Sequence, residues 1–224
     1  MTNPLIVALD VPTLEEATAL ADRVGDAAGG VKVGMELFYS EGPLVVTAFD
    51  APVFLDLKLH DIPTTVARAM QALEPIAPWM VNVHSLGGRS MMQAAAEAKP
   101  PSTKLLAVTI LTHLSDEDLR ELGLPPAGEA VPALSKLAAE AGCDGVVCAP
   151  LDVERVRAVV APDFLVVTPG VRPAGSGGDE HARALTPSAA IQAGATHLVV
   201  GRPVTRADDP RNAALAILDE IGAR

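Results

Sequence analysis

Short runs of apolar residues alternate with longer amphipathic stretches along the chain. Eight runs are four to eight residues long or close to it, and polar, Gly or Pro residues follow each one. They span residues 5–9, 31–33, 53–57, 80–83, 105–110, 145–148, 164–167 and 198–200. Such runs, rich in Val, Leu and Ile, are typical of strands that are buried on both faces in a parallel sheet.

Helix-start signals follow several of these runs. Residues 13–16 (TLEE) have the pattern of a capping box, residues 115–118 (SDED) open another helix, and residues 186–187 (TP) place Pro at a first helical position. Strands that alternate with helices imply right-handed crossovers and a parallel sheet. Eight units favour a closed (β/α)8 barrel, a TIM barrel, over an open doubly wound sheet. We expect one α/β domain over residues 1–224.

Composition narrows the class of protein further. The 224 residues include 17 Lys and Arg against 28 Asp and Glu, a net charge of −11, and only 3% are aromatic. With 49% hydrophobic residues the chain is too apolar for disorder. A nucleic-acid partner is not expected, because the acidic chain repels phosphate and has few rings for base stacking.

Targeting signals and cysteines predict the compartment. No basic residue precedes Arg23 and Asp10 interrupts the first apolar stretch, so we expect neither a signal peptide nor, without a long apolar run, a membrane partner. Cys143 and Cys148 lie in or beside an apolar run, which predicts buried reduced thiols and not a zinc site. The chain is expected to be cytoplasmic.

Charged residues at the ends of the apolar runs are the candidates for chemistry, because catalytic residues of barrels lie at the carboxyl ends of strands. Asp10 ends the first run, Lys32 lies within the second, and Asp56 and Lys58 end the third, with Asp61 just beyond. Strand alternation places Asp56 and Lys58 on one face and the intervening leucines on the helix-facing side. An alternating network of Lys32, Asp56, Lys58 and Asp61 would satisfy all four charges.

Structural roles compete with this interpretation. Asp61 could simply cap the next helix, whereas Thr13 already offers the cap that Asp10 would supply. Lys32, flanked by two valines, needs a partner in any buried setting. A purely structural ion network remains an alternative.

Four motifs carry a resemblance to a known family. Residues 56–65 (DLKLHDIPTT), together with 31–34 (VKVG), 168–173 (TPGVRP) and 201–204 (GRPV), resemble the signature of the orotidine 5′-monophosphate decarboxylase family from end to end. The resemblance implies a (β/α)8 barrel that forms uridine 5′-monophosphate and CO2, the last step of de novo pyrimidine nucleotide synthesis. It implies no metal and no cofactor.

The resemblance also implies catalytic roles. Lys32, Asp56, Lys58 and Asp61 match the charged tetrad of the family, with Lys58 as the proton donor. Asp10 matches the residue that binds the ribose or orients Lys32.

The resemblance extends to a partner subunit. In the family, the matches to Asp61, Ile62 and Thr65 reach into the neighbouring subunit's site, which implies a homodimer with shared active sites.

Further positions match substrate-binding residues. Thr112 corresponds to a residue at the pyrimidine edge, and Arg172, Gly201 and Arg202 to phosphate binders. Many bacterial members have Gln in the loop after the seventh strand, where this chain aligns His181. Imidazole can donate to phosphate, but its charge varies near neutral pH.

The residues predict a mechanism that suits this reaction. Loss of CO2 from C6 of the pyrimidine leaves a carbanion that no neighbouring carbonyl delocalises, so the protein must supply electrostatic stabilisation and a proton. The ammonium of Lys58 can do both. The carboxylates of Asp56 and Asp61 favour its charged form and argue against a Schiff base.

Two other functions stay open. A metal-dependent sugar-phosphate decarboxylase or hexulose-phosphate synthase would share the barrel, but it would need an acidic Mg²⁺ ligand where this chain has Lys32. A non-catalytic nucleotide-binding dimer would have little reason to keep the buried charges.

Overall fold

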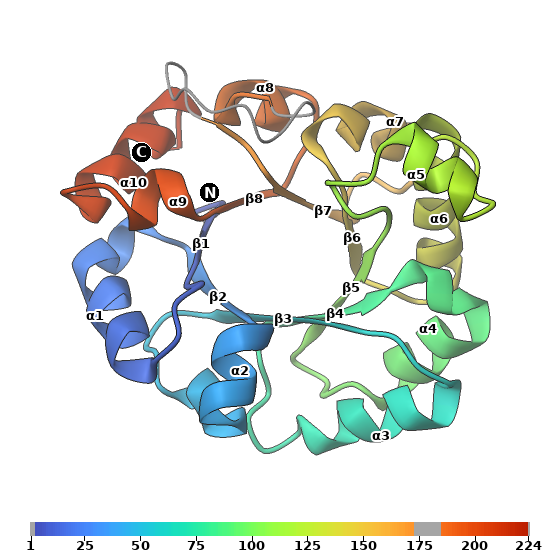
Figure 1. The fold of residues 1–224 in the computed structure, drawn as a ribbon, viewed down its shortest axis with the longest axis horizontal. Coiled ribbons are helices and arrows are strands. Elements are labelled where there is room, and N and C mark those ends of the chain that lie inside the picture. Colours follow the sequence, from blue (N-terminus) through green and yellow to red (C-terminus); the bar gives the residue numbers. More distant parts are fainter. Residues whose placement is uncertain (1–2, 173–184, 224) are drawn as a thin grey trace.

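The eight apolar runs form eight parallel strands in the computed structural model, which describes residues 3–172 and 185–223. The strands close into a barrel in chain order, with β1 paired to β8 (Figure 1). This confirms the predicted (β/α)8 architecture. The strands are β1 (Leu5–Ala8), β2 (Gly30–Gly34), β3 (Val53–Leu59), β4 (Met80–His84), β5 (Lys104–Val108), β6 (Gly145–Val147), β7 (Leu165–Pro169) and β8 (His197–Val200).

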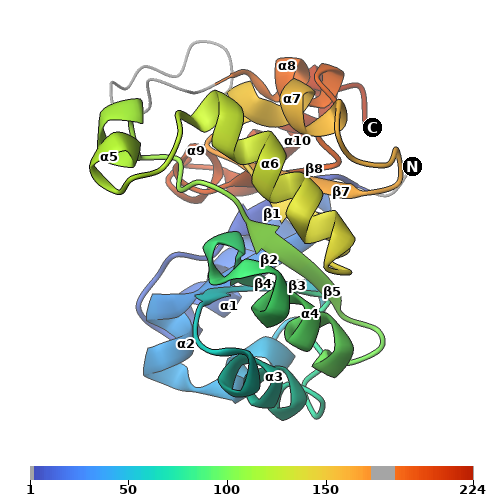
Figure 2. The ribbon, with the colours of Figure 1, turned by 90° about the vertical axis from the view of Figure 1, so that its right-hand side faces the viewer.

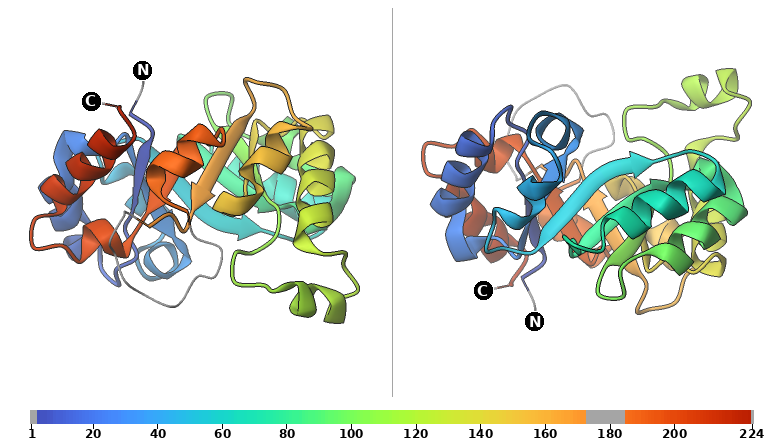
Figure 3. Two further views of the ribbon diagram at one scale, coloured as in Figure 1. Left: turned by 90° about the horizontal axis from the view of Figure 1, so that it is seen from above. Right: turned by 90° about the horizontal axis from the view of Figure 1, so that it is seen from below.

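Helices surround the ring of strands (Figure 1). They are α1 (Leu14–Val24), α2 (Met35–Glu41), α3 (Pro63–Ala72), α4 (Gly88–Ala98), α5 (Asp116–Glu121), α6 (Ala127–Glu140), α7 (Val153–Arg157), α8 (Pro187–Gln192), α9 (Arg202–Thr205) and α10 (Pro210–Glu220). Short 3-10 turns complete the connections: η1 (Gly25–Ala27), η2 (Pro43–Thr47), η3 (Ser85–Gly87) and η4 (Pro150–Asp152). The short α5 stands away from the body of the barrel (Figures 2 and 3).

The helix starts form as the sequence predicts, with one difference in detail. Thr13 Oγ1 accepts a hydrogen bond from the Glu16 N–H at 3.3 Å, and Thr186 caps α8 in the same way. At residues 13–16 only the Thr13 half of the predicted capping box forms, whereas both reciprocal bonds form between Ser115 and Asp118. Because Thr13 caps α1, the carboxylate of Asp10 is left to other partners.

The core has two layers, which follow from the alternation of strand side chains. Ile6 and Ala8 of β1 lie in a cluster inside the barrel, whereas Leu5 and Val7 lie in the larger cluster that includes the helices. The inner cluster is aliphatic except for Phe54, with Trp79 packed against it. The barrel interior is therefore a packed support beneath the carboxyl ends of the strands.

The third strand is irregular where its charged residues lie. Leu55 pairs with Val81 and Leu59 with Val83, so four steps along β3 face two steps along β4. Lys58 lies within this bulge with a φ of 51°. A positive φ is uncommon for a residue with a side chain and needs support from its surroundings.

The remaining expectations concern the cysteines and the membrane. Cys143 and Cys148 are buried and unpaired, and burial raises the pKa of each thiol to about 12. This confirms buried reduced thiols. Across the described ranges, none of the helices has the length and apolar character needed to cross a bilayer.

Candidate active site

A cavity of about 480 Å³ opens at the carboxyl ends of the strands, a size typical of small-molecule sites. Eight of the residues singled out from the sequence line it, although they come from six different strand–helix units. They are Asp10, Lys32, Asp56, Lys58, Thr112, Arg172, Gly201 and Arg202. The fold therefore brings together most of the candidate residues.

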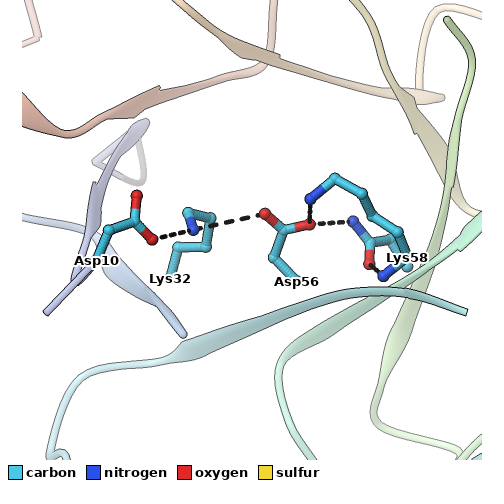
Figure 4. A network of polar contacts seen from close by, with 5 residues as sticks. Asp10, Lys32, Asp56 and Lys58 are labelled. Atoms are coloured by element: carbon cyan, nitrogen blue, oxygen red, sulfur yellow. Dashed lines mark hydrogen bonds and ion pairs between the residues drawn. The ribbon is translucent and has the colours of Figure 1, made fainter. Parts of the chain in front are cut away.

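Four charged side chains run in a line across one side of the cavity (Figure 4). Lys32 Nζ lies 2.8 Å from Asp10 Oδ1 and 3.5 Å from Asp56 Oδ2. Lys58 Nζ lies 2.7 Å from the other oxygen of Asp56, Oδ1. Two ammoniums and two carboxylates thus alternate, and Asp56 is shared between both lysines.

Electrostatics keep Asp56 ionised at neutral pH. Burial opposes its charge, but the attractions of Lys32 and Lys58 and hydrogen bonds from Lys58 and Asn82 outweigh burial, so the pKa of Asp56 lies below its usual value. A partly buried, ionised carboxylate beside two lysines is typical of a site that works through charge.

Gly34, at the end of β2, leaves room for the first ion pair. A Cβ atom at this position would lie 3.1 Å from Asp10 Oδ1 and 3.2 Å from Lys32 Nζ. The absence of a side chain at Gly34 therefore lets the two charged groups meet directly above the backbone.

Asn82 of β4 belongs to the same network and was missed by the sequence analysis. Its Nδ2 donates to Asp56 Oδ1 at 2.7 Å, and its Oδ1 accepts the Lys58 backbone N–H at 2.7 Å. The available signal was a polar residue between two valines in a buried strand.

The opposite side of the cavity is cationic. Arg172 follows β7 and Arg202 begins α9 directly after β8, and Figure 1 shows these strands across the ring from β3. Thr112, after β5, lines the same cavity. Guanidinium groups suit an anionic ligand group, and barrels often bind phosphate between their seventh and eighth loops.

Three predicted residues lie outside this cavity in the single chain. Asp61 and Ile62 line a separate hollow beside η3, and Thr65 is exposed on α3. Within the described part of the chain, Asp61 makes no ion pair with either lysine; its Oδ1 accepts the Ile62 N–H at 2.6 Å. Asp61 therefore does not join the ion-pair network within the single chain, where Asp10 is the second carboxylate. The reason is that β3 ends at Leu59 and the chain turns outward toward α3.

Two histidines stack beside the site. The rings of His60 and His84 are 5.4 Å apart between centroids and inclined by 20°. Burial, followed by the nearby His60 and Lys58, holds the pKa of His84 below its usual value. His84 Nδ1 accepts the Leu86 N–H, so a neutral ring suits its position.

Over residues 3–172 and 185–223, no three His, Cys, Asp or Glu side chains gather in a way that could hold a metal ion. His181, aligned with the family's Gln, lies outside the described residues.

Comparisons with known proteins identify the family of this chain. Residues 3–217 match the family described as "Orotidine 5′-phosphate decarboxylase / HUMPS family". A relative from Alkalilimnicola ehrlichii, named orotidine 5′-phosphate decarboxylase, is 50% identical over 227 residues, which cover 98% of this chain and 97% of the relative. A relative of the same name from Trichlorobacter lovleyi is 46% identical over 231 residues, with 99% and 96% covered.

Solved structures agree as well. The crystal structure of orotidine 5′-phosphate decarboxylase from Lactobacillus acidophilus superposes with a TM-score of 0.87 at 41% identity, covering 99% of this chain and 100% of that one. The enzyme of that name from Pyrococcus horikoshii gives a TM-score of 0.80 at 26% identity, covering 97% and 99%. Sequence, barrel and charged cavity together establish that this chain belongs to the orotidine 5′-phosphate decarboxylase / HUMPS family.

Proposed function

We propose that this chain decarboxylates orotidine 5′-monophosphate to uridine 5′-monophosphate and CO2 without a cofactor. The observation that carries the proposal is a single cavity with Lys58 and Asp56 on one side and two arginines on the other. Relatives 46–50% identical over nearly the whole chain are named for this activity. The two buried thiols suit the cytoplasmic location expected for the enzyme.

The arginine side of the cavity is proposed to hold the substrate's phosphate. Arg172 and Arg202 supply guanidinium donors, and Gly201 brings backbone close to the anion without a side chain. The pyrimidine then extends toward Lys58, with Thr112 at its edge. Binding energy from the remote phosphate can thereby support chemistry at C6.

The chemical step uses the alternating charges. The bond between C6 and the carboxylate breaks, CO2 leaves, and the electron pair stays on C6. The ammonium of Lys58 stabilises this carbanion and donates a proton to it, after which the amine regains a proton from solvent. Asp56, ionised and 2.7 Å from Lys58 Nζ, holds the ammonium in place. Lys32 and Asp10 complete the chain of charges and face the ribose.

The metal-dependent members of the wider family are the alternative. Their chemistry needs an acidic Mg²⁺ ligand near the end of the second strand, and Lys32 holds that place between Asp10 and Asp56. An ammonium there repels a divalent cation, which favours the orotidylate reaction.

One assay separates these functions. Loss of orotidylate absorbance is followed with and without EDTA, using Lys58→Ala as the matched inactive variant. We expect turnover that is independent of chelator and several orders of magnitude lower in Lys58→Ala, with ligand binding retained. Activity that disappears with EDTA, or folded protein without activity, would contradict the proposal.

We also propose a homodimer with shared active sites. Asp61 and Ile62 are exposed on the single chain, and Ile62, at 64% exposure, and Leu86, at 40%, form an apolar margin around their hollow. A second copy would cover this margin and, as the family resemblance implies, would bring Asp61, Ile62 and Thr65 to the other chain's cavity.

Mixed dimers test this arrangement. Lys58→Ala and Asp61→Ala subunits are each expected to be inactive as homodimers, whereas mixing them creates one intact site in each heterodimer. Heterodimers that form and show no recovered activity would argue against shared sites.

His181 remains a proposed phosphate donor. If it binds phosphate, His181→Gln is expected to raise KM less than His181→Ala does. Equal effects of the two substitutions would assign it no role.

A further inference from the structure

Asn82 is a polar side chain with no exposed surface, in the middle of β4. It is not among the residues that line the cavity. Both ends of its amide are engaged with groups on the neighbouring strand β3, and those groups belong to the two residues placed closest to the chemistry.

The first contact supports the irregular backbone of Lys58. Within the bulge of β3 the ladder to β4 is interrupted between Leu55 and Leu59. The Lys58 N–H instead donates to Asn82 Oδ1 at 2.7 Å. A buried N–H without a partner is costly, so this bond stabilises the left-handed conformation that aims the Lys58 side chain.

The second contact fixes the carboxylate. Asn82 Nδ2 donates to Asp56 Oδ1, the same oxygen that accepts from Lys58 Nζ, and both distances are 2.7 Å. Asp56 is thereby held in one rotamer, with its other oxygen directed at Lys32. One amide therefore orients the carboxylate and also the backbone of the lysine bound to it.

We infer that Asn82 is a positioning residue that sets where Lys58 Nζ lies, by bridging the Lys58 backbone and the Asp56 carboxylate. The requirement is for an amide, because the site needs one acceptor and one donor in fixed places. An Asp of the same shape would still accept from Lys58 but would set a second carboxylate against Asp56, unless it carried a proton. The inference rests on the proposed function for its kinetic consequence, but not for its geometry.

The groups around Asn82 determine which titrations could affect a pH experiment on this residue. Asp56 and Lys58 face it from β3, with Lys32 behind Asp56. On the β5 side its register partner is Leu106, which is apolar. Within β4 the nearest titratable group is His84, whose pKa is lowered by burial and then by the charges of His60 and Lys58.

The test compares Asn82→Ala and Asn82→Asp with Ser135→Ala. Ser135 is equally buried and donates to the Val131 carbonyl in α6, far along the chain from the cavity, so it controls for loss of a buried hydrogen bond. The Tm of each variant is first compared with that of wild type. Then kcat and KM are measured at assay pH values from 5.5 to 8.5.

We expect Asn82→Ala to lower kcat on the order of 100-fold with little change in KM, since a misplaced catalytic group loses rate and not affinity. Asn82→Asp is expected to be as slow at pH 8.5 but to recover toward wild type as pH falls, because a protonated carboxyl can again donate to Asp56. Ser135→Ala is expected to keep wild-type kcat. A kcat within about twofold of wild type in Asn82→Ala, or parallel pH profiles for both Asn82 variants, would overturn the inference.

A structure of Asn82→Asp at high pH provides a measurement that does not depend on activity. Lys58 Nζ is expected to leave hydrogen-bond distance of Asp56 Oδ1, and an unmoved Lys58 would overturn the inference whatever the substrate. If instead wild type and Ser135→Ala both fail to turn over orotidylate while Lys58 moves in the variant, the proposed function fails and the positioning role stands.

Discussion

Replacing Lys32 by Met tests how much the ion pairs of Lys32 at the barrel mouth contribute to the stability of the folded protein. Methionine keeps most of the aliphatic volume and removes the ammonium. The side chains of Lys32 and Asp56 are 10% and 14% exposed, whereas that of Asp10 is 62% exposed. Solvent therefore screens the pair with Asp10, which is worth at most about 1 kcal/mol.

The pair with Asp56 dominates the expected loss. At 3.5 Å and an effective dielectric constant of roughly 20, the attraction is about 5 kcal/mol before the desolvation of both ions is subtracted. Removing one partner of a buried pair costs about 3–5 kcal/mol. We expect a value near the lower end, about 3 kcal/mol, because Lys58 and Asn82 still hold Asp56. That corresponds to a fall in Tm of roughly 6–12 °C for a chain of this size.

The loss is also expected to depend on pH. A carboxylate whose folded pKa is lowered contributes stability that is present above its unfolded value of 3.8 and is lost as pH falls through the folded value. Without Lys32 the pKa of Asp56 rises, because burial is offset less well. The deficit of Lys32→Met should therefore be full near pH 7 and shrink below about pH 4.

Urea unfolding at several pH values measures this deficit, with the exposed Lys136→Met as a matched control expected to stay within about 0.5 kcal/mol of wild type. A deficit below about 1 kcal/mol at pH 7, or one that stays constant down to pH 3, would refute the reasoning.

Three further predictions concern Gly34, His197 and the two cysteines. Gly34→Ala, whose methyl group presses on the first ion pair, is expected to lower kcat roughly tenfold with little effect on Tm; unchanged kcat would contradict the close approach. Burial lowers the pKa of His197, so its contribution to stability is present above the unfolded value of 6.5 and is lost as pH falls. The Tm of His197→Phe should therefore change less between pH 7 and pH 5 than the Tm of wild type does. An equal change in both proteins would contradict this prediction. Cys143 and Cys148, with pKa values of about 12, are expected to react with Ellman's reagent at pH 8 only after unfolding; rapid labelling of native protein would show otherwise.

The barrel could be predicted because buried parallel strands have a direct signature, an apolar run that ends in a polar turn. The shared face of Asp56 and Lys58 followed from the alternation of side chains, and their 2.7 Å contact agrees with it. Period-two alternation carries no information on a bulge, however, so the left-handed backbone of Lys58 was not foreseen. Asn82 was missed for the same reason, because its role exists only in the bulged register.

Asp61 shows the second limit of sequence reasoning. Three residues beyond Lys58, it was expected in the same network, but proximity along the chain does not decide direction once a strand has ended. The proposed dimer would give Asp61 a site on a second copy of the chain, a contact that the family resemblance implied but that the pattern of residues within one chain did not predict.

The bulge in β3 bears on how this chemistry could be moved to another scaffold. A designer who copied the linear motif DLKLHD into a regular barrel strand would obtain the right residues on an extended backbone, with Lys58 aimed elsewhere. The smallest part that could be transferred is instead a pair of adjacent strands. The amide oxygen that accepts the hydrogen bond from the Lys58 N–H belongs to Asn82, 24 residues further along the chain. A design that transfers this site should therefore include both the bulged β3 and the β4 strand with Asn82.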